Sequence, residues 1–177
     1  LVGAAIGSGG AEELMDAIVS YVPSPDEVAP AKAAKGDTEI VLNADVEGPL
    51  AAFVFKTTAD PFVGKLSFFR VISGTLSANQ EVFDSSSGET ERIGQVFVPI
   101  GKNQESVPSL AAGDIGSVSK LAHTVTGDTL TTKSASVILP KIAFPEPIFR
   151  VAVHPKSKAD LEKLSSSLAR LLEEDPS

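Results

Sequence analysis

The sequence predicts a mainly β protein, with one small barrel at its centre and one helix on each side of it. Short segments rich in Val, Ile, Phe and Thr fill residues 45–143, and clusters of Gly, Ser, Asn and Asp separate them. On both sides of this block, apolar residues recur three and four positions apart, as on one face of a helix. Proline-containing stretches separate the three parts, so we expect more than one structural unit.

The central block carries five strand patterns, which we place at residues 50–57, 66–72, 81–84, 90–97 and 115–121. Its turn signals are specific: Ser87-Gly88 fits a tight hairpin, and residues 77–79 and 126–128 fit further turns. About six short strands joined in this way usually close into a small barrel, which removes exposed sheet edges. We therefore expect a β-barrel domain over residues 45–143.

The first flanking helix is predicted at residues 11–22. Glu12 and Glu13 lie in its first turn, where acidic side chains complement the positive end of the helix dipole. Pro23 and Pro25 end the helix, and the polar stretch after them indicates a linker, which we place at residues 31–44 between a unit at 1–30 and the barrel. The apolar face of the helix consists of Leu14, Ile18, Val19 and Val22.

A second boundary is predicted at Pro145 and Pro147. Beyond it, alternation at residues 148–153 predicts a strand, and residues 157–174 predict a helix whose start is marked by Ser157 and Asp160, as in a capping box. One strand and one helix cannot bury a core, so residues 144–177 predict the start of an α+β domain. Because the first residue is not Met, we expect a piece of a larger protein, cut inside a domain at each end.

The composition excludes several classes of protein. No stretch approaches the ~18 consecutive apolar residues of a membrane span, and the chain has no cysteine, which excludes disulfides, thiolate zinc sites and cysteine nucleophiles. The formal net charge of −8 disfavours broad binding to DNA or RNA, although an acidic protein can still carry a local basic patch. We expect no membrane and no DNA partner.

No complete catalytic site and no metal site is predicted. The run 7–10 (GSGG) precedes a helix but lacks the Lys-Ser/Thr ending of a phosphate-binding loop. His123 and His154 are far apart and have no Ser or Asp arrangement beside them that indicates a triad. The paired carboxylates, such as Glu89 and Glu91, are explained by helix ends or hairpins.

The barrel contains few basic residues, and composition alone indicates ordinary solubilising charges. Strand alternation predicts that Lys65 is exposed and that Arg70, in phase with Leu66, lies along the barrel wall with a buried stem. The basic side chains of this block are Lys56, Lys65, Arg70, Arg92, Lys102 and Lys120.

Residues 48–71 closely resemble the second domain of elongation factor G, the translational GTPase that moves tRNAs and mRNA through the ribosome. Residues 155–160 and 173–176 are similar to the opening of the family's third domain, which is ferredoxin-like. The matching landmarks of the barrel and its exit are Asp60-Pro61-Phe62-Val63-Gly64-Lys65, Glu91-Arg92-Ile93-Gly94, Ala112-Gly113-Asp114-Ile115, Thr126-Gly127-Asp128-Thr129-Leu130 and Phe144-Pro145-Glu146-Pro147. The resemblance implies a translation-factor-type barrel.

The resemblance also gives the N-terminal unit an identity. Gly3-Ala4-Ala5 resembles the last guanine-contacting motif of the family's GTPase domain, usually Gly-Ser-Ala, and residues 11–25 resemble that domain's closing helix. The phosphate-binding loop, both switches and the Asn-Lys-x-Asp motif are not in this sequence. We therefore expect no cofactor and no GTP hydrolysis in this chain, and GTP with Mg²⁺ in the full-length protein.

The resemblance implies a cytoplasmic, monomeric GTPase whose barrel docks on small-subunit ribosomal RNA, with Lys65, Arg92 and Lys102 in the contact. One departure is notable: typical members of the family have a His- and Arg-rich strand and loop where this chain has residues 95–105. These residues are more similar to elongation factor G-like paralogues. Three alternatives stay open. They are a paralogue specialised in ribosome rescue, recycling or drug protection, a protein-interaction barrel without RNA contact, and a carrier of aminoacyl-tRNA, which the match to the translocase branch disfavours.

Overall fold

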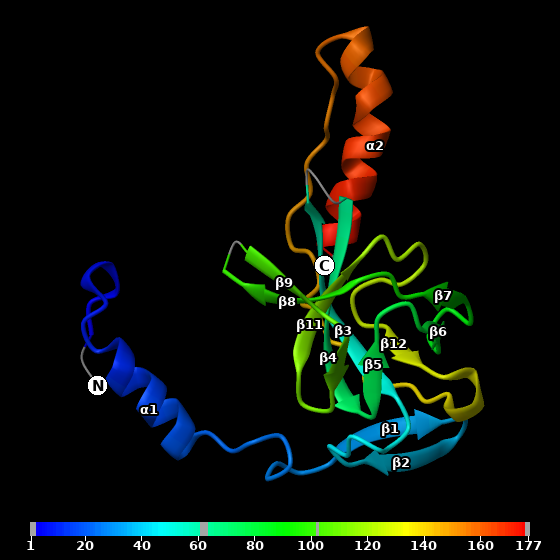
Figure 1. Ribbon diagram of the computed structural model, residues 1–177. Coiled ribbons are helices and arrows are strands. Elements are labelled where there is room, and N and C mark those ends of the chain that lie inside the picture. The colour runs from blue at the N-terminus through cyan, green and yellow to red at the C-terminus, as the bar shows by residue number, and fades with distance from the viewer. Residues whose placement is uncertain (1–2, 61–63, 102, 176–177) are drawn as a thin grey trace.

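The computed structural model describes residues 3–60, 64–101 and 103–175. A β-rich body forms the centre of the molecule, and Figure 1 shows a helix on either side of it. Helix α1 (Ala11–Tyr21) lies at the end of an extended arm, and helix α2 (Lys158–Glu174) stands against the opposite end of the body. The mainly β fold class is thereby confirmed.

Within the described residues, eight strands form an antiparallel sheet in the order β7-β6-β12-β3-β4-β11-β8-β9. Its central pair, β3 and β4, is the longest, and their ladder contains two register shifts, with Ile72 as the extra residue on β4 and Phe55 as the extra residue on β3. The strands of this sheet are β3 (Ala51–Asp60), β4 (Gly64–Ser73), β6 (Glu81–Asp84), β7 (Thr90–Arg92), β8 (Val96–Ile100), β9 (Asn103–Val107), β11 (Ile115–Ser119) and β12 (Thr129–Thr131). A second ladder pairs β5 (Thr75–Ser77) with β10 (Ser109–Ala111).

The eight-stranded sheet curls around one apolar core. Val82 of β6 and Val96 of β8, which lie toward opposite edges of the sheet, belong to the same buried cluster as Phe69 of β4. Backbone hydrogen bonds join the two edges: the Asn79 N–H donates to the Gly94 carbonyl at 3.0 Å, and the Ala78 N–H donates to the Pro108 carbonyl at 2.9 Å. These contacts close the sheet into a barrel.

The predicted linker at residues 31–44 is wrong in one respect, because most of it is a hairpin. Strand β1 (Ala31–Lys35) pairs with β2 (Thr38–Leu42), and Gly36 between them has a φ of 58°. Residues of the hairpin form a second apolar cluster with the outer side of the barrel: Ala33, Leu42, Ala51, Val137 and Leu139. Burial of these side chains stabilises strands that the Ala- and Lys-rich sequence of β1 does not indicate.

Four predicted strands correspond to β3, β4, β6 and β11. The fifth, at residues 90–97, divides into β7 and β8, because Ile93 and Gly94 instead bond to the backbone at residues 79 and 80. The Ser87-Gly88 turn lies in a loop at residues 85–89 rather than in a two-residue hairpin. This loop is held by the Asp84 carboxylate, whose Oδ1 accepts from the Ser86 and Ser87 N–H groups at 2.9 and 3.3 Å.

Both predicted helices are present. At the start of α2, the Asp160 N–H donates to Ser157 Oγ at 3.2 Å, and the Ser157 hydroxyl donates to Asp160 Oδ2 at 2.8 Å, which confirms the predicted cap. No helix among the described residues is long and apolar enough to span a membrane.

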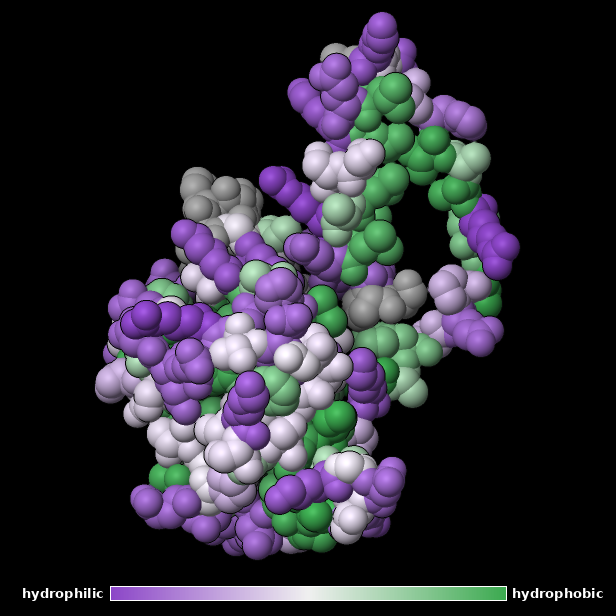
Figure 2. All heavy atoms as spheres, turned by 90° about the vertical axis from the view of Figure 1, so that its right-hand side faces the viewer, coloured by the Kyte–Doolittle hydropathy of each residue, from purple (hydrophilic) through white to green (hydrophobic). Residues whose placement is uncertain are grey.

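The strand predicted at residues 148–153 is wrong. This segment has no strand assignment, and Ile148, Phe149 and Val151 are exposed. Among the described residues no strand pairs with it, and alternation of apolar side chains cannot make a strand without a hydrogen-bonding neighbour. Figure 2 shows the resulting apolar side chains on the projection that residues 140–174 form beyond the barrel.

Candidate nucleic-acid interface

Three lysines lie on or next to three adjacent strands, and we call Lys56, Lys65 and Lys120 the lysine cluster. Lys56 lies on β3, opposite Phe68 of β4. Lys65 is the second residue of β4, and the Lys120 N–H, just after β11, donates to the Lys65 carbonyl at 2.8 Å. In the register of β3 and β4, Lys56 and Lys65 are three rows apart and project from opposite faces of the sheet, so the two lysines that the fold brings side by side are Lys65 and Lys120.

The charges of the lysine cluster are available to a partner. Lys56 and Lys120 are exposed, Lys65 is half-buried, and the Lys56 Nζ lies 5.9 Å from the centre of the Phe68 ring. Among the described residues, no carboxylate lies within 4.0 Å of these three ammonium groups, since the ion pairs found are Lys32–Glu39 and Lys141–Asp128. Exposed lysines beside an aromatic ring are a combination that suits RNA.

The structure brings the predicted contact residues together only in part. Lys65 belongs to the lysine cluster, whereas the exposed Arg92 ends β7, at an outer position of the sheet order, opposite Glu81. Lys102 lies outside the described residues. The sequence reasoning missed the association of Lys120 with Lys65, which depends on strand pairing.

Arg70 is exposed as a whole residue and also lines an apolar cavity described below, so the burial predicted for its stem alone stays a prediction. Ser67, Phe69 and Val71 are completely buried in β4, so the interior takes the alternate set of side chains around this position. Arg70 lies on the same face of β4 as Leu66, as predicted, but that face is buried at Leu66 and exposed to solvent at Arg70.

Glu91 holds the segment after β11 in place. Its carboxylate is buried and accepts four hydrogen bonds, from the N–H groups of Ala122, His123 and Thr124 at 2.6, 2.9 and 2.6 Å and from the Thr124 hydroxyl at 2.7 Å. Burial acts to raise the pKa of Glu91, but these donors outweigh it and lower the pKa from its usual value. Glu91 therefore fixes the loop that carries Lys120 and is not a general acid.

Two buried acidic residues lie together near the start of the loop at residues 85–89. Asp84 and Asp128 are both buried, and Asp84 Oδ2 has no hydrogen-bond partner among the described residues. Burial raises the pKa of Asp128, and the neighbouring Asp84 adds to this, against the Val125 N–H and Lys141, which lower it. Among the described residues, no group of three or more His, Asp or Glu side chains is placed to hold a metal ion.

The predicted guanine-contacting motif lies in a segment closed by two backbone hydrogen bonds. The Ala4 N–H donates to the Gly9 carbonyl at 2.9 Å, and the Gly9 N–H donates to the Ala4 carbonyl at 3.2 Å, so the Ala4 backbone donor is engaged. A Cβ at Gly3 would approach the Gly9 carbonyl oxygen to 2.9 Å. The contact of Gly3, Ala4 and Ala5 with a guanine base stays a prediction.

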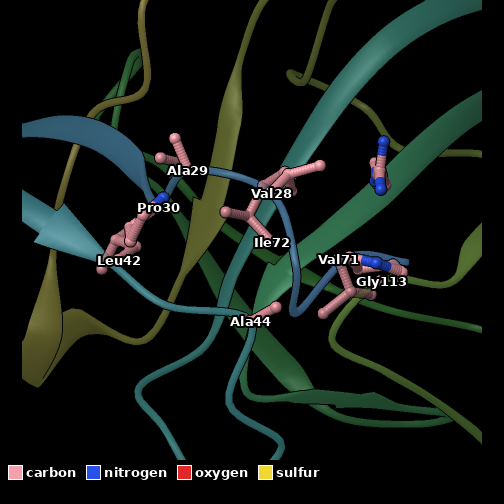
Figure 3. A pocket seen from close by; sticks show the side chains of 11 residues that line it. Val28, Ala29, Pro30, Leu42, Ala44, Val71, Ile72 and Gly113 are labelled. Carbon is pink, nitrogen blue, oxygen red and sulfur yellow. The ribbon is translucent and has the colours of Figure 1, made fainter. Parts of the chain in front are cut away.

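An apolar cavity of about 150 Å³ lies where residues 25–30 cross the barrel. Figure 3 shows this segment, with Val28 and Pro30, running past Ile72 of β4. Gly113, with a φ of 100°, leaves space for the segment, because a Cβ there would come within 2.7 Å of Pro25 Cγ. The cavity is part of the packing of this segment on the barrel, with Arg70 as its one charged lining residue among those that the structure describes.

The curled sheet and its flanking hairpin define a domain II barrel of the translation-factor type. Two family descriptions match the chain: "Elongation factor G domain 2" over residues 49–133 and "Elongation Factor G, domain III" over residues 144–177. A crystal structure of a protein from Thermus thermophilus is similar over 94% of this chain, with 30% sequence identity and a TM-score of 0.74. The chain belongs to the elongation factor G family. It spans 23% of the length of the Thermus protein.

Proposed function

We propose that this chain is the ribosome-docking part of an elongation factor G-like, ribosome-dependent GTPase that acts in the cytoplasm as a monomer. The barrel binds small-subunit ribosomal RNA and transmits the state of a GTP- and Mg²⁺-binding domain to translocation. The family match over both the barrel and the following domain supports this role. Gly3, Ala4 and Ala5 contribute to the guanine contact only if the Ala4–Gly9 bond exchanges.

The observation that carries the RNA contact is the lysine cluster. A protein with a net charge of −8 repels phosphate on average, so docking on RNA needs a local group of unpaired cations. Lys65 and Lys120 supply neighbouring cations of this kind where β4 lies beside β11, and Lys56 adds a third cation from the other face of the β3–β4 pair. The proposed contact also includes Arg92, at the end of β7, and Lys102, which lies outside the described residues.

Charge reversal in the full-length protein tests this role. Lys65→Glu, Arg92→Glu and Lys102→Glu are each expected to weaken co-sedimentation with ribosomes at low salt. Each lost phosphate contact lowers the steepness of the salt dependence by about 1 in log–log slope. Lys35→Glu is the matched control, because Lys35 is an exposed lysine of the β1–β2 hairpin outside the barrel sheet. Unchanged binding in all three variants would refute the proposed contact.

A specialised paralogue is the second candidate. Residues 95–105, which form most of β8 and β9, are the part of the barrel that departs from the translocase pattern. A protein of this kind keeps the salt-dependent ribosome binding but does not support translocation in a reconstituted system. A protein-interaction barrel, in contrast, shows little salt dependence, so sedimentation and translocation assays together separate the three possibilities.

A further inference from the structure

The far end of β3 presents a backbone donor that no strand covers among the described residues. Strand β12 pairs with β3 only at residues 51–53, whereas β3 continues along β4 as far as residue 60. Beyond residue 53, Val54 still exchanges backbone hydrogen bonds with residues 127 and 128, and Thr57 bonds to Thr126, but no strand among the described residues covers this edge of β3 near Ala59. The N–H of Ala59 lies in this part of β3 and is not used in the sheet, which leaves it open to another acceptor.

The last residue of α2 supplies that acceptor. Glu174 Oε1 accepts a hydrogen bond from the Ala59 N–H at 2.6 Å, although the two residues are 115 positions apart. The end of α2 rests on β3, and Figure 1 shows it against the upper end of the β3–β4 pair. Glu173, the preceding residue, is exposed and has no hydrogen bond or ion pair among the described residues.

One lysine of the lysine cluster lies beside this hydrogen bond. Ala59 is directly opposite Lys65 in the sheet, so their side chains share a face, whereas Lys56 projects from the other face. A single anionic oxygen thus sits on the backbone N–H next to the strand position of Lys65. A phosphate oxygen of an RNA backbone takes the same partners, a main-chain donor and a nearby ammonium group.

We propose that the Ala59 N–H and Lys65 form a phosphate-binding position for the RNA backbone, and that Glu174 occupies this position in the present conformation. Helix α2 and an RNA phosphate then compete for the end of β3. The RNA contact proposed above becomes stronger when α2 moves away, so the domain that begins at residue 144 regulates the barrel. That the bound phosphate belongs to RNA rests on the proposed function. That an anion binds at this position does not depend on it.

Amide NMR on the whole chain tests the position, with inorganic phosphate as the probe. Glu174→Gln removes the competing charge but keeps a side chain of the same size. Glu173→Gln makes the same change of charge one residue earlier, where the structure shows no bond to the described part of the barrel, and is the matched control. We expect the Ala59 amide signal to shift at severalfold lower phosphate concentration in E174Q than in E173Q or the unaltered chain.

Equal phosphate responses of E174Q and E173Q would overturn the proposed position. In a second arm, a short single-stranded RNA replaces phosphate, and E174Q is expected to bind it severalfold more tightly than E173Q at low salt. If phosphate shows the difference and RNA does not, the anion position stands and the RNA role of the barrel fails. Adding K65A to E174Q is expected to reverse the gain, and its retention would exclude Lys65 from the position.

Discussion

The barrel and the two helices beside it use apolar residues in opposite ways. In the barrel, Phe69, Leu130 and Val54 are completely buried around one core. In α1 no residue is buried, and Val19 and Met15 are largely exposed. In α2 the same holds for Leu172 and Leu171, which are 72% and 58% exposed. Helical spacing of apolar residues therefore predicts where a helix forms and not what covers it.

Hydrogen bonding shows the same contrast. The buried carboxylates Glu91 and Asp84 of the barrel each bind several backbone N–H groups of nearby loops. The carboxylates of α2 lie on the surface, with Glu174 as the link to the barrel that the structure shows. The barrel is thus held by its own residues, whereas the flanking helices contribute little to its stability.

The largest expected difference between the two regions follows from removing one apolar side chain in each. Phe69→Ala leaves a cavity in the core and is expected to lower the free energy of unfolding by about 3–5 kcal/mol. Leu172→Ala in α2 is expected to change it by less than about 0.5 kcal/mol. Urea unfolding followed by circular dichroism measures both, and similar losses would contradict the contrast.

The next effect concerns the buried carboxylate of β7. Glu91→Gln replaces the carboxylate by an amide, which accepts more weakly from the three N–H groups and places its own NH₂ donor among them. We expect a loss of about 2–3 kcal/mol in the free energy of unfolding. Glu89→Gln, two residues earlier on the exposed surface, is the control. Because the folded-state pKa of Glu91 is lowered, its contribution is present above the unfolded pKa and is lost as the pH falls through the folded value. An unfolding series at falling pH should therefore show a smaller gap between E91Q and the unaltered chain.

A smaller effect is expected where the extended arm crosses the barrel. Gly113→Ala strains a left-handed backbone position and places a Cβ 2.7 Å from Pro25 Cγ, so we expect a loss of about 1–2 kcal/mol. Gly88→Ala has a similar positive φ of 80° but meets no atom within 4 Å. The difference between their melting temperatures isolates the contact with Pro25, and equal values would show that the arm does not press on the barrel.

The smallest effect is expected at the acidic pair. Burial and the nearby Asp84 raise the pKa of Asp128 in the folded protein. The contribution of Asp128 to stability is therefore fully present below its pKa in the unfolded chain, and it is lost as the pH rises through its pKa in the folded protein. Asp128→Asn is expected to remove this dependence and to change stability at neutral pH by about 1 kcal/mol or less. Unfolding curves between about pH 4 and pH 7 measure it, and parallel pH dependences in both proteins would contradict the raised pKa of Asp128.

The sequence predicted the elements that its local pattern determines. Residues 66–72 alternate and carry aromatic residues, and they form the central strand β4. The polar β9 and the three-residue β12 have no such signal, because they form only through pairing with β8, β3 and β6. Conversely, residues 148–153 have the alternation but no partner strand among the described residues, and stay outside any sheet.

The candidate site was predictable only as a set of residue types. Lys65 stands in a family landmark, so the resemblance selected it. Lys56 and Lys120 carry no such mark. The register of β3 places Lys56 on the face opposite to that of Lys65, and the hydrogen bond that follows β11 places Lys120 beside Lys65. The bond from Ala59 to Glu174 joins residues 115 positions apart, a separation at which local patterns give no information.

The pairing of Ala34 with Ile138 has a mechanical consequence. Two backbone hydrogen bonds of 2.8 Å join the segment that enters the barrel to the segment that leaves it, in antiparallel orientation. A pull on the chain before β1 and after residue 140 opens such a pair from one end, one bond at a time. Tension applied across these two segments therefore opens the junction bond by bond, rather than shearing both hydrogen bonds at once.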